Sequence, residues 1–406
     1  MSLDFNAYSK ENQLNPYPAY DRLRRESPVY YGDWGKDGKF WVLTRYEDID
    51  GVLRNAKDFP NSLGPGLKGM TDDGRPFLVL NGIDPPDHTR IRRVIAPFFT
   101  PRAVESKEPL VRDVCNDVIN SILASGNNPF DLIAEYANPI ASAVIFDMLG
   151  VPVSLRERYK AWTEDYITVQ GGQGGEKEKV NFRDFYDDAF LLMEERRRNP
   201  GPDLISVMVK AVDDEGLISE QEAHDNVMVM FVAGMETTEK LIGNAVVALV
   251  QNPDEYAKVL EDRSLIGSLI EETLRYDTSA VSIMRTAALD VEIGGQLIRR
   301  GERLMLVLGS AGRDPDQFPD PDRFDVERSP NDHIGFGEGP HACPGMWLAR
   351  IETRVAVETL LDRMPSLSLD PGQFDESNRL QSTINRGFLH LEVQFDPALV
   401  SKRTTA

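Results

Sequence analysis

The stretch FGEGPHACPG, residues 336–345, combines residue types that together could do chemistry. It contains Cys343, one of two cysteines in 406 residues, and His341 lies two positions before it. Neither a helix nor a strand favours so many glycines and prolines, so we expect a shaped loop. Glycines let several backbone N–H groups turn toward a sulfur atom and stabilise its thiolate form.

Cys343 can be interpreted in more than one way. Zinc and disulfide interpretations fail, because no second cysteine or CxxC pair accompanies it. A catalytic pair with His341 is conceivable, although nucleophilic cysteines usually take their base from elsewhere in the fold. A thiolate that binds a metal is the remaining option. The other cysteine, Cys115, lies on an apolar helical stripe within 111–123 and is interpreted as a buried core residue.

A second concentration of unusual residues is AGMETT, residues 233–238, in the most apolar part of a predicted helix. A glycine in a helix interior costs about 1 kcal/mol relative to alanine, and a buried carboxylate costs more unless it has a partner. Gly234, Glu236 and Thr237 therefore favour a helix that is opened locally for a ligand, with a proton path beside it. The alternative, a solvent-facing segment, agrees less well with the apolar residues on both sides.

Two further pairs are weak signals when each is taken alone. Glu272 and Arg275 are three residues apart and share a helix face, but such pairs are common on surfaces. His88 and Arg92 are four residues apart, after a Pro-Pro helix start, and would suit an acidic partner such as a carboxylate. A charged outer helix face explains the second pair equally well.

The elements that must position these residues are mostly helices. Helical patterns are predicted for about 84–277 and 343–363, and strand patterns for about 28–60, 285–310 and 380–396. Because we find no linker, we predict a mainly α protein with a smaller β portion, folded as a single large helix-rich domain over residues 1–406.

The clearest helix begins at SEQE, where Ser219 and Glu222 form a capping box, and is expected to stop near Pro253. It has roughly thirty residues and a length of about 45 Å. Because it is apolar nearly all round, it should cross the middle of the protein. The glycine-rich stretch 171–179 is interpreted equally well as a solvated loop or as a hinge beneath a lid.

The composition limits the function classes. The chain has 66 acidic and 45 basic residues and a net charge of −21, which disfavours nucleic acid and anionic membranes as partners. Its N-terminal sequence lacks the pattern of a signal peptide, and apolar runs such as 227–235 are too short to span a bilayer. We expect a cytoplasmic monomer with reduced thiols and with no membrane or nucleic-acid partner.

Together these motifs resemble those of the cytochrome P-450 family of haem-thiolate monooxygenases, of the soluble bacterial type. The family's loop F-G-x-G-x-H-x-C-x-G, followed by L-A-R, is matched at 336–350, and A-G-x-[DE]-T-T is matched at 233–238. E-x-x-R is matched by Glu272 and Arg275, and D-P-P-x-H-T-x-x-R at 84–92. The resemblance covers essentially the whole chain, and it implies the cytochrome P-450 fold and the insertion of one oxygen atom of O2 into an organic substrate.

The resemblance implies a role for each matched residue. Cys343 would be the proximal thiolate ligand of the iron of haem b (iron protoporphyrin IX). Glu236 and Thr237 would relay protons to O2. The remaining haem or O2 contacts would be His88, Arg92, Arg285 and His341 at the propionates, Phe336, Gly337 and Gly345 in the loop, and Ala233 and Gly234 beside O2. The structural charge network under the loop would comprise Glu272, Arg275 and Arg323. The substrate pocket would include Phe77, Leu78, Met230, Ala233, Val281, Ile283, Ile384 and Asn385.

The resemblance also implies partners. Electrons from NAD(P)H would arrive through a separate ferredoxin or flavodoxin and its reductase, and an acidic carrier would be steered by a basic face. The docking face would include Arg93, Arg102, Arg112, Arg350 and Arg354, although a scattered solvated surface is the alternative. The substrate would be a small to medium, mainly hydrophobic molecule that is hydroxylated or oxidatively demethylated. Two other functions, a peroxide-driven peroxygenase and a haem-based sensor or carrier, would not need the pair Glu236 and Thr237.

Two positions depart from the family pattern. Pro344 follows Cys343, where the family usually carries a residue with a backbone N–H. Because proline cannot donate, the thiolate should lose one potential hydrogen bond, donate electrons more strongly and lower the haem potential. Thr278 stands where relatives commonly have proline, so the family is a weaker guide to the backbone at 278–284.

Overall fold

The structure, a computed structural model, describes residues 5–33, 38–62, 78–170, 176–369 and 375–400. The chain divides into two compact units. Unit 1 comprises residues 1–64, 108–140 and 237–406, and unit 2 comprises residues 65–107 and 141–236. The long helix α11 (Glu220–Gln251) begins in unit 2 and ends in unit 1. The single domain over 1–406 stays a prediction.

Unit 1 combines helices with the described strands. Its helices are α1 (Lys10–Leu14), α2 (Tyr17–Glu26), α3 (Tyr46–Arg54), α6 (Glu108–Ser125), α12 (Pro253–Glu261), α13 (Ile266–Tyr276), α14 (Leu308–Ala311) and α15 (Met346–Arg363). Its strands are β1 (Val29–Asp33), β2 (Lys39–Leu43), β3 (Phe130–Asp131), β4 (Ile283–Thr286), β5 (Val291–Ile293), β6 (Gln296–Ile298), β7 (Arg303–Leu306), β8 (Ser368–Leu369) and β9 (Glu392–Gln394). The predicted β portion from both ends of the chain is therefore confirmed.

The largest sheet has the strand order β1-β2-β7-β4, in which β2 and β7 run parallel and the other neighbours run antiparallel. Side chains alternate between the two faces of a strand. Trp41 and Leu43 accordingly join a core cluster with residues of α3, whereas Phe40 and Val42 join one with residues of α2. The sheet is thus packed on both faces.

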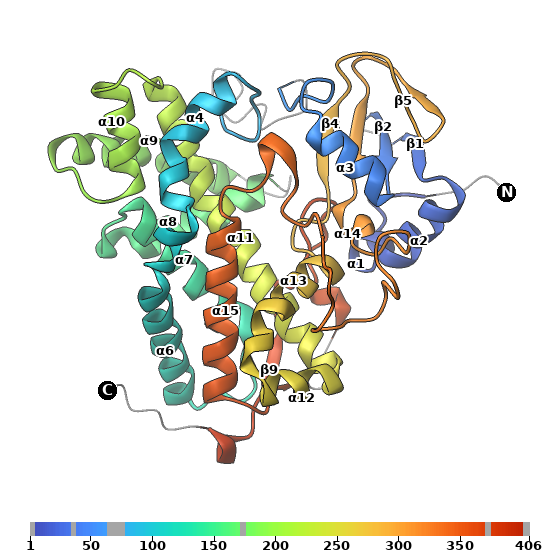
Figure 1. Cartoon of the computed structure of the whole chain (residues 1–406). Helices are drawn as coiled ribbons and strands as arrows, with labels where there is room; N and C mark the ends of the chain where they lie inside the picture. Colours follow the sequence, from blue (N-terminus) through green and yellow to red (C-terminus); the bar gives the residue numbers. More distant parts are fainter. Residues whose placement is uncertain (1–4, 34–37, 63–77, 171–175, 370–374, 401–406) are drawn as a thin grey trace. The chain divides into compact units, whose positions relative to one another are not determined.

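Three helices of unit 1 pack together, and one of them follows residues 336–345, here called the cysteine loop. Helix α15 begins directly after the loop and packs against α6 and against α13 (Figure 1). Cys115 on α6 is fully buried, as its position on the apolar stripe predicts.

One stretch of the described residues, Leu132–Leu149, is long and apolar enough to cross a membrane, but 72% of it is buried, as in a core helix.

Unit 2 is built from helices in the part of the chain that the structure describes. These are α4 (Asp87–Ile95), α5 (Pro101–Glu105), most of α7 (Asn138–Leu149), α8 (Arg156–Gln170), α9 (Glu176–Arg198) and α10 (Leu204–Asp213). Helix α9 packs against α8 and α10, and α10 packs against α4. Of the glycine-rich stretch 171–179, residues 171–175 lie outside the described residues, so neither interpretation of it is tested.

The start of α11 confirms the predicted capping box. The Ser219 N–H donates to Glu222 Oε2 at 2.7 Å, and the Glu222 N–H donates to Ser219 Oγ at 3.2 Å. The helix spans 32 residues and ends at Gln251, and Pro253 is the first residue of α12. The sequence therefore predicts both ends of this helix correctly.

Candidate active site

The loop before α15 is folded by its glycines and by short backbone hydrogen bonds. Gly337 and Gly339 have φ of +70° and +71°, a region that residues with a side chain rarely adopt. The Cys343 N–H donates to the Phe336 carbonyl at 2.9 Å, which closes the loop on itself. Cys343 is half-buried and forms no disulfide. The loop thus presents one cysteine from a tightly folded backbone.

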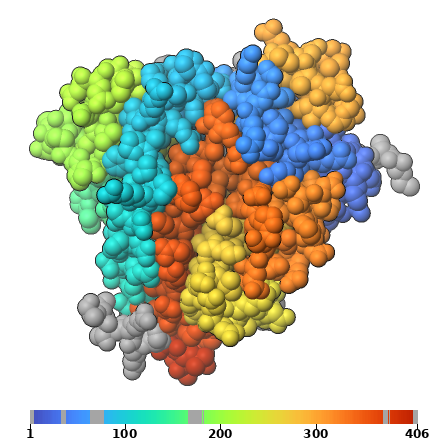
Figure 2. All heavy atoms as spheres, in the orientation of Figure 1, coloured from blue at the N-terminus to red at the C-terminus, as the bar shows by residue number. Residues whose placement is uncertain are grey.

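Helix α3 fixes one side of this loop. A Cβ atom at Gly339 would lie 2.7 Å from the Leu53 carbonyl oxygen, so the close approach of the loop to α3 requires glycine. Arg54 Nη2 lies 3.2 Å from Glu338 Oε2, which adds an ion pair at the same contact. Figure 2 shows the orange surface of the segment that leads to the loop beside the blue surface of α3.

A buried charge network lies on α13. Glu272 and Arg275 are both fully buried, and Arg275 donates through Nε and Nη2 to the Glu272 carboxylate at 2.8 Å each. Arg275 also donates to the carbonyl oxygens of Gly312, Pro321 and Arg323 at 2.6–3.0 Å. Because a buried charge needs partners, this arginine holds the irregular backbone between α14 and the loop in one path.

The third residue of this network differs from the prediction. The Arg323 side chain is 61% exposed and lies 3.9 Å from Glu255, so Arg323 contributes only its carbonyl oxygen. Arg328 instead donates from Nε to both oxygens of Glu272 at 3.2 Å. The two arginines lie in one irregular segment with no periodic pattern, so the sequence did not distinguish the side chain that turns inward.

The middle of α11 departs from the prediction in one respect. The helix is continuous through residues 233–238, so the local opening is not found. A Cβ atom at Gly234 would lie 2.8 Å from two carbon atoms of Ile145 on α7, so the glycine permits close helix packing. Glu236 is buried and Thr237 half-buried, whereas Ala233 is exposed in the middle of this apolar helix.

The four predicted propionate ligands are divided between the two units. His88 on α4 is buried and Arg92 is half-buried, and both belong to unit 2. Arg285 on β4 is buried beside Leu304 of β7, and His341 is half-buried in the loop; both belong to unit 1. Their binding to a common group stays a prediction.

The predicted pocket residues separate into two groups. The Val281 side chain is buried in the core cluster that covers one face of the large sheet, and Ile283 packs against the cluster on the other face. The placement of the Val281 side chain in a pocket wall stays a prediction. The Val281 N–H donates to the Ile384 carbonyl at 2.7 Å, and the Ile384 side chain is 52% exposed.

The other pocket residues are placed without a test of their role. Asn385 is half-buried and forms a β-bridge with Ala280, Met230 is buried on α11, and Leu78 donates its N–H to Asp225 at 2.9 Å. Phe77 lies outside the described residues. Thr278 is buried, and its hydroxyl has no hydrogen-bond partner among the described residues.

Comparison with known proteins decides the family. The sequence model "Cytochrome P450" matches residues 176–379. The "Biotin biosynthesis cytochrome P450" of Bacillus subtilis is 36% identical over 91% of this chain and 94% of the relative, and the "Vitamin D(3) 25-hydroxylase" of Pseudonocardia autotrophica is 36% identical over 94% of each. The chain therefore belongs to the cytochrome P450 family. It is accordingly an oxidoreductase of a haem-binding monooxygenase family.

A solved structure supports the same family assignment. The cytochrome P450 structure "P450BioI in complex with hexadec-9Z-enoic acid ligated Acyl Carrier Protein" has a TM-score of 0.87 and 34% identity, and covers 95% of this chain and 100% of that chain. The fold class predicted from the sequence, the mainly α cytochrome P450 fold, is therefore confirmed.

The residues of unit 1 fit the haem of this family. One half-buried thiol, that of Cys343, lies in a glycine-folded loop, which suits a thiolate ligand of iron. Arg285 and His341 provide a cation and an imidazole that can bind carboxylate groups. Among the described residues no cluster of three or more His, Cys, Asp or Glu could hold a bare metal ion.

Proposed function

We propose that this cytochrome P450 inserts one oxygen atom of O2 into a small to medium, mainly hydrophobic organic molecule, by hydroxylation or oxidative demethylation. The observation that carries the proposal is the half-buried thiol of Cys343 in the loop closed by the Cys343–Phe336 hydrogen bond. The electrons would come from NAD(P)H through a separate ferredoxin or flavodoxin and its reductase. The hydroxylase among the relatives supports this reaction type.

When bound, the haem would supply the activation of O2. The residues of the chain would hold and protect it. Cys343 would provide the axial sulfur, and Arg285 and His341 would donate hydrogen bonds to the propionates, as would His88 and Arg92 by the family resemblance. The buried network of Glu272 and Arg275 would keep the loop in place.

The proton path would start at Glu236. Its carboxyl group is buried on α11, and Thr237 is the next residue of the helix. A carboxyl group can take up and release a proton, and the Thr237 hydroxyl can hold that proton at Oγ1 and donate it toward the ligand side. This pair favours the O2-dependent reaction over a peroxygenase or a sensor.

The substrate class is inferred from apolar surface. Ile384 is largely exposed although it is apolar, which is expected of a residue that contacts a hydrophobic molecule. The neighbour that holds hexadec-9Z-enoic acid on an acyl carrier protein raises the question of how the substrate is presented. A spectral titration of the ferric protein with free fatty acid and with the carrier-bound acyl chain distinguishes the two. We place the reaction in the cytoplasm, where reduced carriers are available.

The two cysteines provide a matched test of the proposal. Cys343→Ala should abolish the thiolate spectrum of the reduced CO complex and all product formation with reduced carrier protein and O2. Cys115→Ala, which removes a buried thiol on α6, should keep both. A thiolate spectrum that survives Cys343→Ala would overturn the proposal. Product formed with peroxide but not with reduced carrier would favour the peroxygenase, and a bound haem without turnover of any compound would favour a sensor.

A further inference from the structure

A second carboxylate on α13, Glu271, binds side chains on both sides of the cysteine loop. Arg350 donates from Nε to Glu271 Oε1 at 2.7 Å and from Nη2 to Oε2 at 2.8 Å, a bidentate pair. His333 Nε2 lies 3.0 Å from the same Oε2. Since Cys343 lies between these two residues in the chain, one carboxylate joins the segment before the loop to the helix after it.

The His333 contact is defined by its other ring nitrogen. The Gly335 N–H donates to His333 Nδ1 at 3.1 Å, so Nδ1 is the acceptor and the proton lies on Nε2. His333 Nε2 therefore donates to Glu271. The imidazole ring thus links the carboxylate to the backbone of the residue directly before Phe336.

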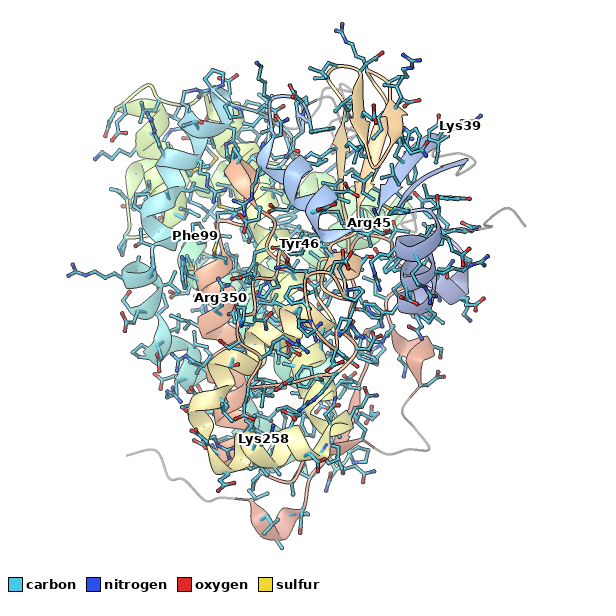
Figure 3. All side chains as sticks on the ribbon, turned by 45° about the vertical axis from the view of Figure 1, so that its right-hand side comes forward. Lys39, Arg45, Tyr46, Phe99, Lys258 and Arg350 are labelled. Atoms are coloured by element: carbon cyan, nitrogen blue, oxygen red, sulfur yellow. The ribbon has the colours of Figure 1, made fainter. Side chains whose placement is uncertain are left out.

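The Arg350 contact reaches the loop through an aromatic ring. The Arg350 guanidinium lies 4.7 Å from the centre of the Phe336 ring and 5.0 Å from that of Trp347 (Figure 3 labels Arg350 on α15). The Phe336 carbonyl is the group that accepts the Cys343 N–H. A change in the position of Arg350 is thereby transmitted to the backbone of the cysteine through one residue.

We propose that Glu271 is a positioning residue that clamps the cysteine loop from both sides, and that it thereby fixes the direction of the Cys343 sulfur and the strength of its bond to the haem iron. The inference rests on the proposed function, because it assumes the haem thiolate. It gives Arg350 a role inside the protein, in place of the predicted docking role. The neighbouring Glu272 holds the more distant segment 325–331, so the two adjacent carboxylates support different parts of the same chain path.

Burial and charge agree with a clamp. The Glu271 side chain is 30% exposed, so solvent does not fully screen its pairs. Burial alone would raise the pKa of Glu271, but the hydrogen bonds from Arg350 and His333 lower it to about 2. The carboxylate is therefore charged at any pH at which the protein works. Glutamine has the same size but only one acceptor oxygen. Its NH2 group would therefore face one of the two donors, Arg350 or His333, and could not accept a hydrogen bond from it.

The test is Glu271→Gln with Glu358→Gln as the matched control. Glu358 lies on α15 and also binds two arginines, Arg112 and Arg354, which belong to α6 and α15 and not to the loop. In the reduced CO complex of Glu271→Gln, the thiolate form should convert to the thiol form about ten- to a hundredfold faster than in the wild type. The variant should also release haem to an acceptor protein faster, by the same factor. Its midpoint potential should also change. Glu358→Gln should match the wild type in all three measurements.

A double substitution separates a clamp from general weakening. If Glu271 and Arg350 act as one unit, Glu271→Gln combined with Arg350→Lys should release haem no faster than the worse single variant. Arg350→Lys keeps the positive charge but loses the bidentate pair with Glu271. It therefore also serves as the test should Glu271→Gln fail to fold. Wild-type rates and potential in both single variants would overturn the inference. A wild type without any thiolate form would instead overturn the proposed function.

Discussion

Asp277 follows the last turn of α13 and Glu352 lies on α15, and both carboxyl groups are buried in unit 1, with 7% and 1% of the residue exposed. Asp277 accepts hydrogen bonds from the Tyr17 hydroxyl at 2.7 Å and from Arg386 Nε at 2.6 Å, and Arg379 Nη1 lies 3.2 Å away. Burial alone would raise the pKa of Asp277, but the two arginines and Tyr17 hold it well below its ordinary value. Asp277 is therefore a carboxylate that joins segments from both ends of the chain.

The pKa of Glu352 is shifted in the opposite direction. Burial raises its pKa well above the ordinary value, and a hydrogen bond with the Thr238 hydroxyl opposes this only in part. Its Oε2 atom has no hydrogen-bond partner among the described residues. Burial thus favours the neutral form of Glu352, whose partner Thr238 lies on α11. The comparison teaches that the partners, and not the depth of burial, decide whether a buried acid is charged.

The largest effect on stability is expected when the charge of Asp277 is removed. Asp277→Asn should lower the free energy of unfolding by about 3–5 kcal/mol, because two buried guanidinium groups lose the carboxylate that they share. Urea unfolding at pH 7 followed by circular dichroism measures this loss. Tyr17→Phe removes a single hydrogen bond to the same carboxylate and should cost only about 1 kcal/mol.

The pH dependence of the same variant provides a second test of how the Asp277 charge contributes to stability. A carboxyl whose folded pKa is lowered contributes stability above its ordinary pKa of 3.8 and loses it as the pH falls. The difference in stability between wild type and Asp277→Asn should therefore shrink under acidic conditions. A loss of stability below about 1 kcal/mol at pH 7 would show that the arginines have sufficient other partners.

Glu352 should show a smaller effect with the opposite pH dependence. A carboxyl whose folded pKa is raised loses stability as the pH rises above its ordinary value of 4.5, by at most about 1.4 kcal/mol per pH unit. Glu352→Gln cannot ionise, so its stability relative to the wild type should grow as the pH rises from 5 to 9. Unfolding at several pH values measures this slope, and Glu358→Gln on the same helix is the control. A flat difference would show that Glu352 is charged.

The sequence predicts those features that local patterns determine. The ends of α11 follow from Ser219 and Pro253, and the pairing of Glu272 with Arg275 follows from helix geometry. The cysteine loop follows from a long motif that allows few other structures. Each of these signals lies within a short stretch of the chain.

Features that depend on distant segments could not be predicted. The sequence indicates that Gly234 leaves space beside the helix, but it does not indicate that Ile145 occupies this space. The inward turn of Arg328 and the clamp at Glu271 likewise depend on the path of irregular backbone, for which no periodic pattern exists. The side-chain direction of Val281 depends on the strand register beyond it. In each case the partner is defined only once the chain is folded.

The smallest effects should lie where solvent reaches the charges. Arg112 donates to Glu108 at 2.7 Å and to Glu358 at 2.9 Å, and Arg354 pairs with the same two carboxylates, so four half-exposed side chains form a ring with no net charge. Arg112→Ala with Arg354→Ala should cost less than about 1 kcal/mol of stability. It leaves two carboxylates without their arginines, so reduction by an acidic carrier should slow while substrate affinity is unchanged.

The ring also separates two explanations of that slower reduction. Removing all four side chains restores a net charge of zero at this surface. If the local field decides the rate, the quadruple variant should recover most of the reduction rate, whereas direct contacts from Arg112 and Arg354 to the carrier require that it stay slow. Stopped-flow reduction at two salt concentrations measures both variants, because a field effect weakens with salt. Wild-type rates in the double variant would exclude this face as the docking site, and would leave the exposed Arg93 and Arg102 as the basic residues to test next.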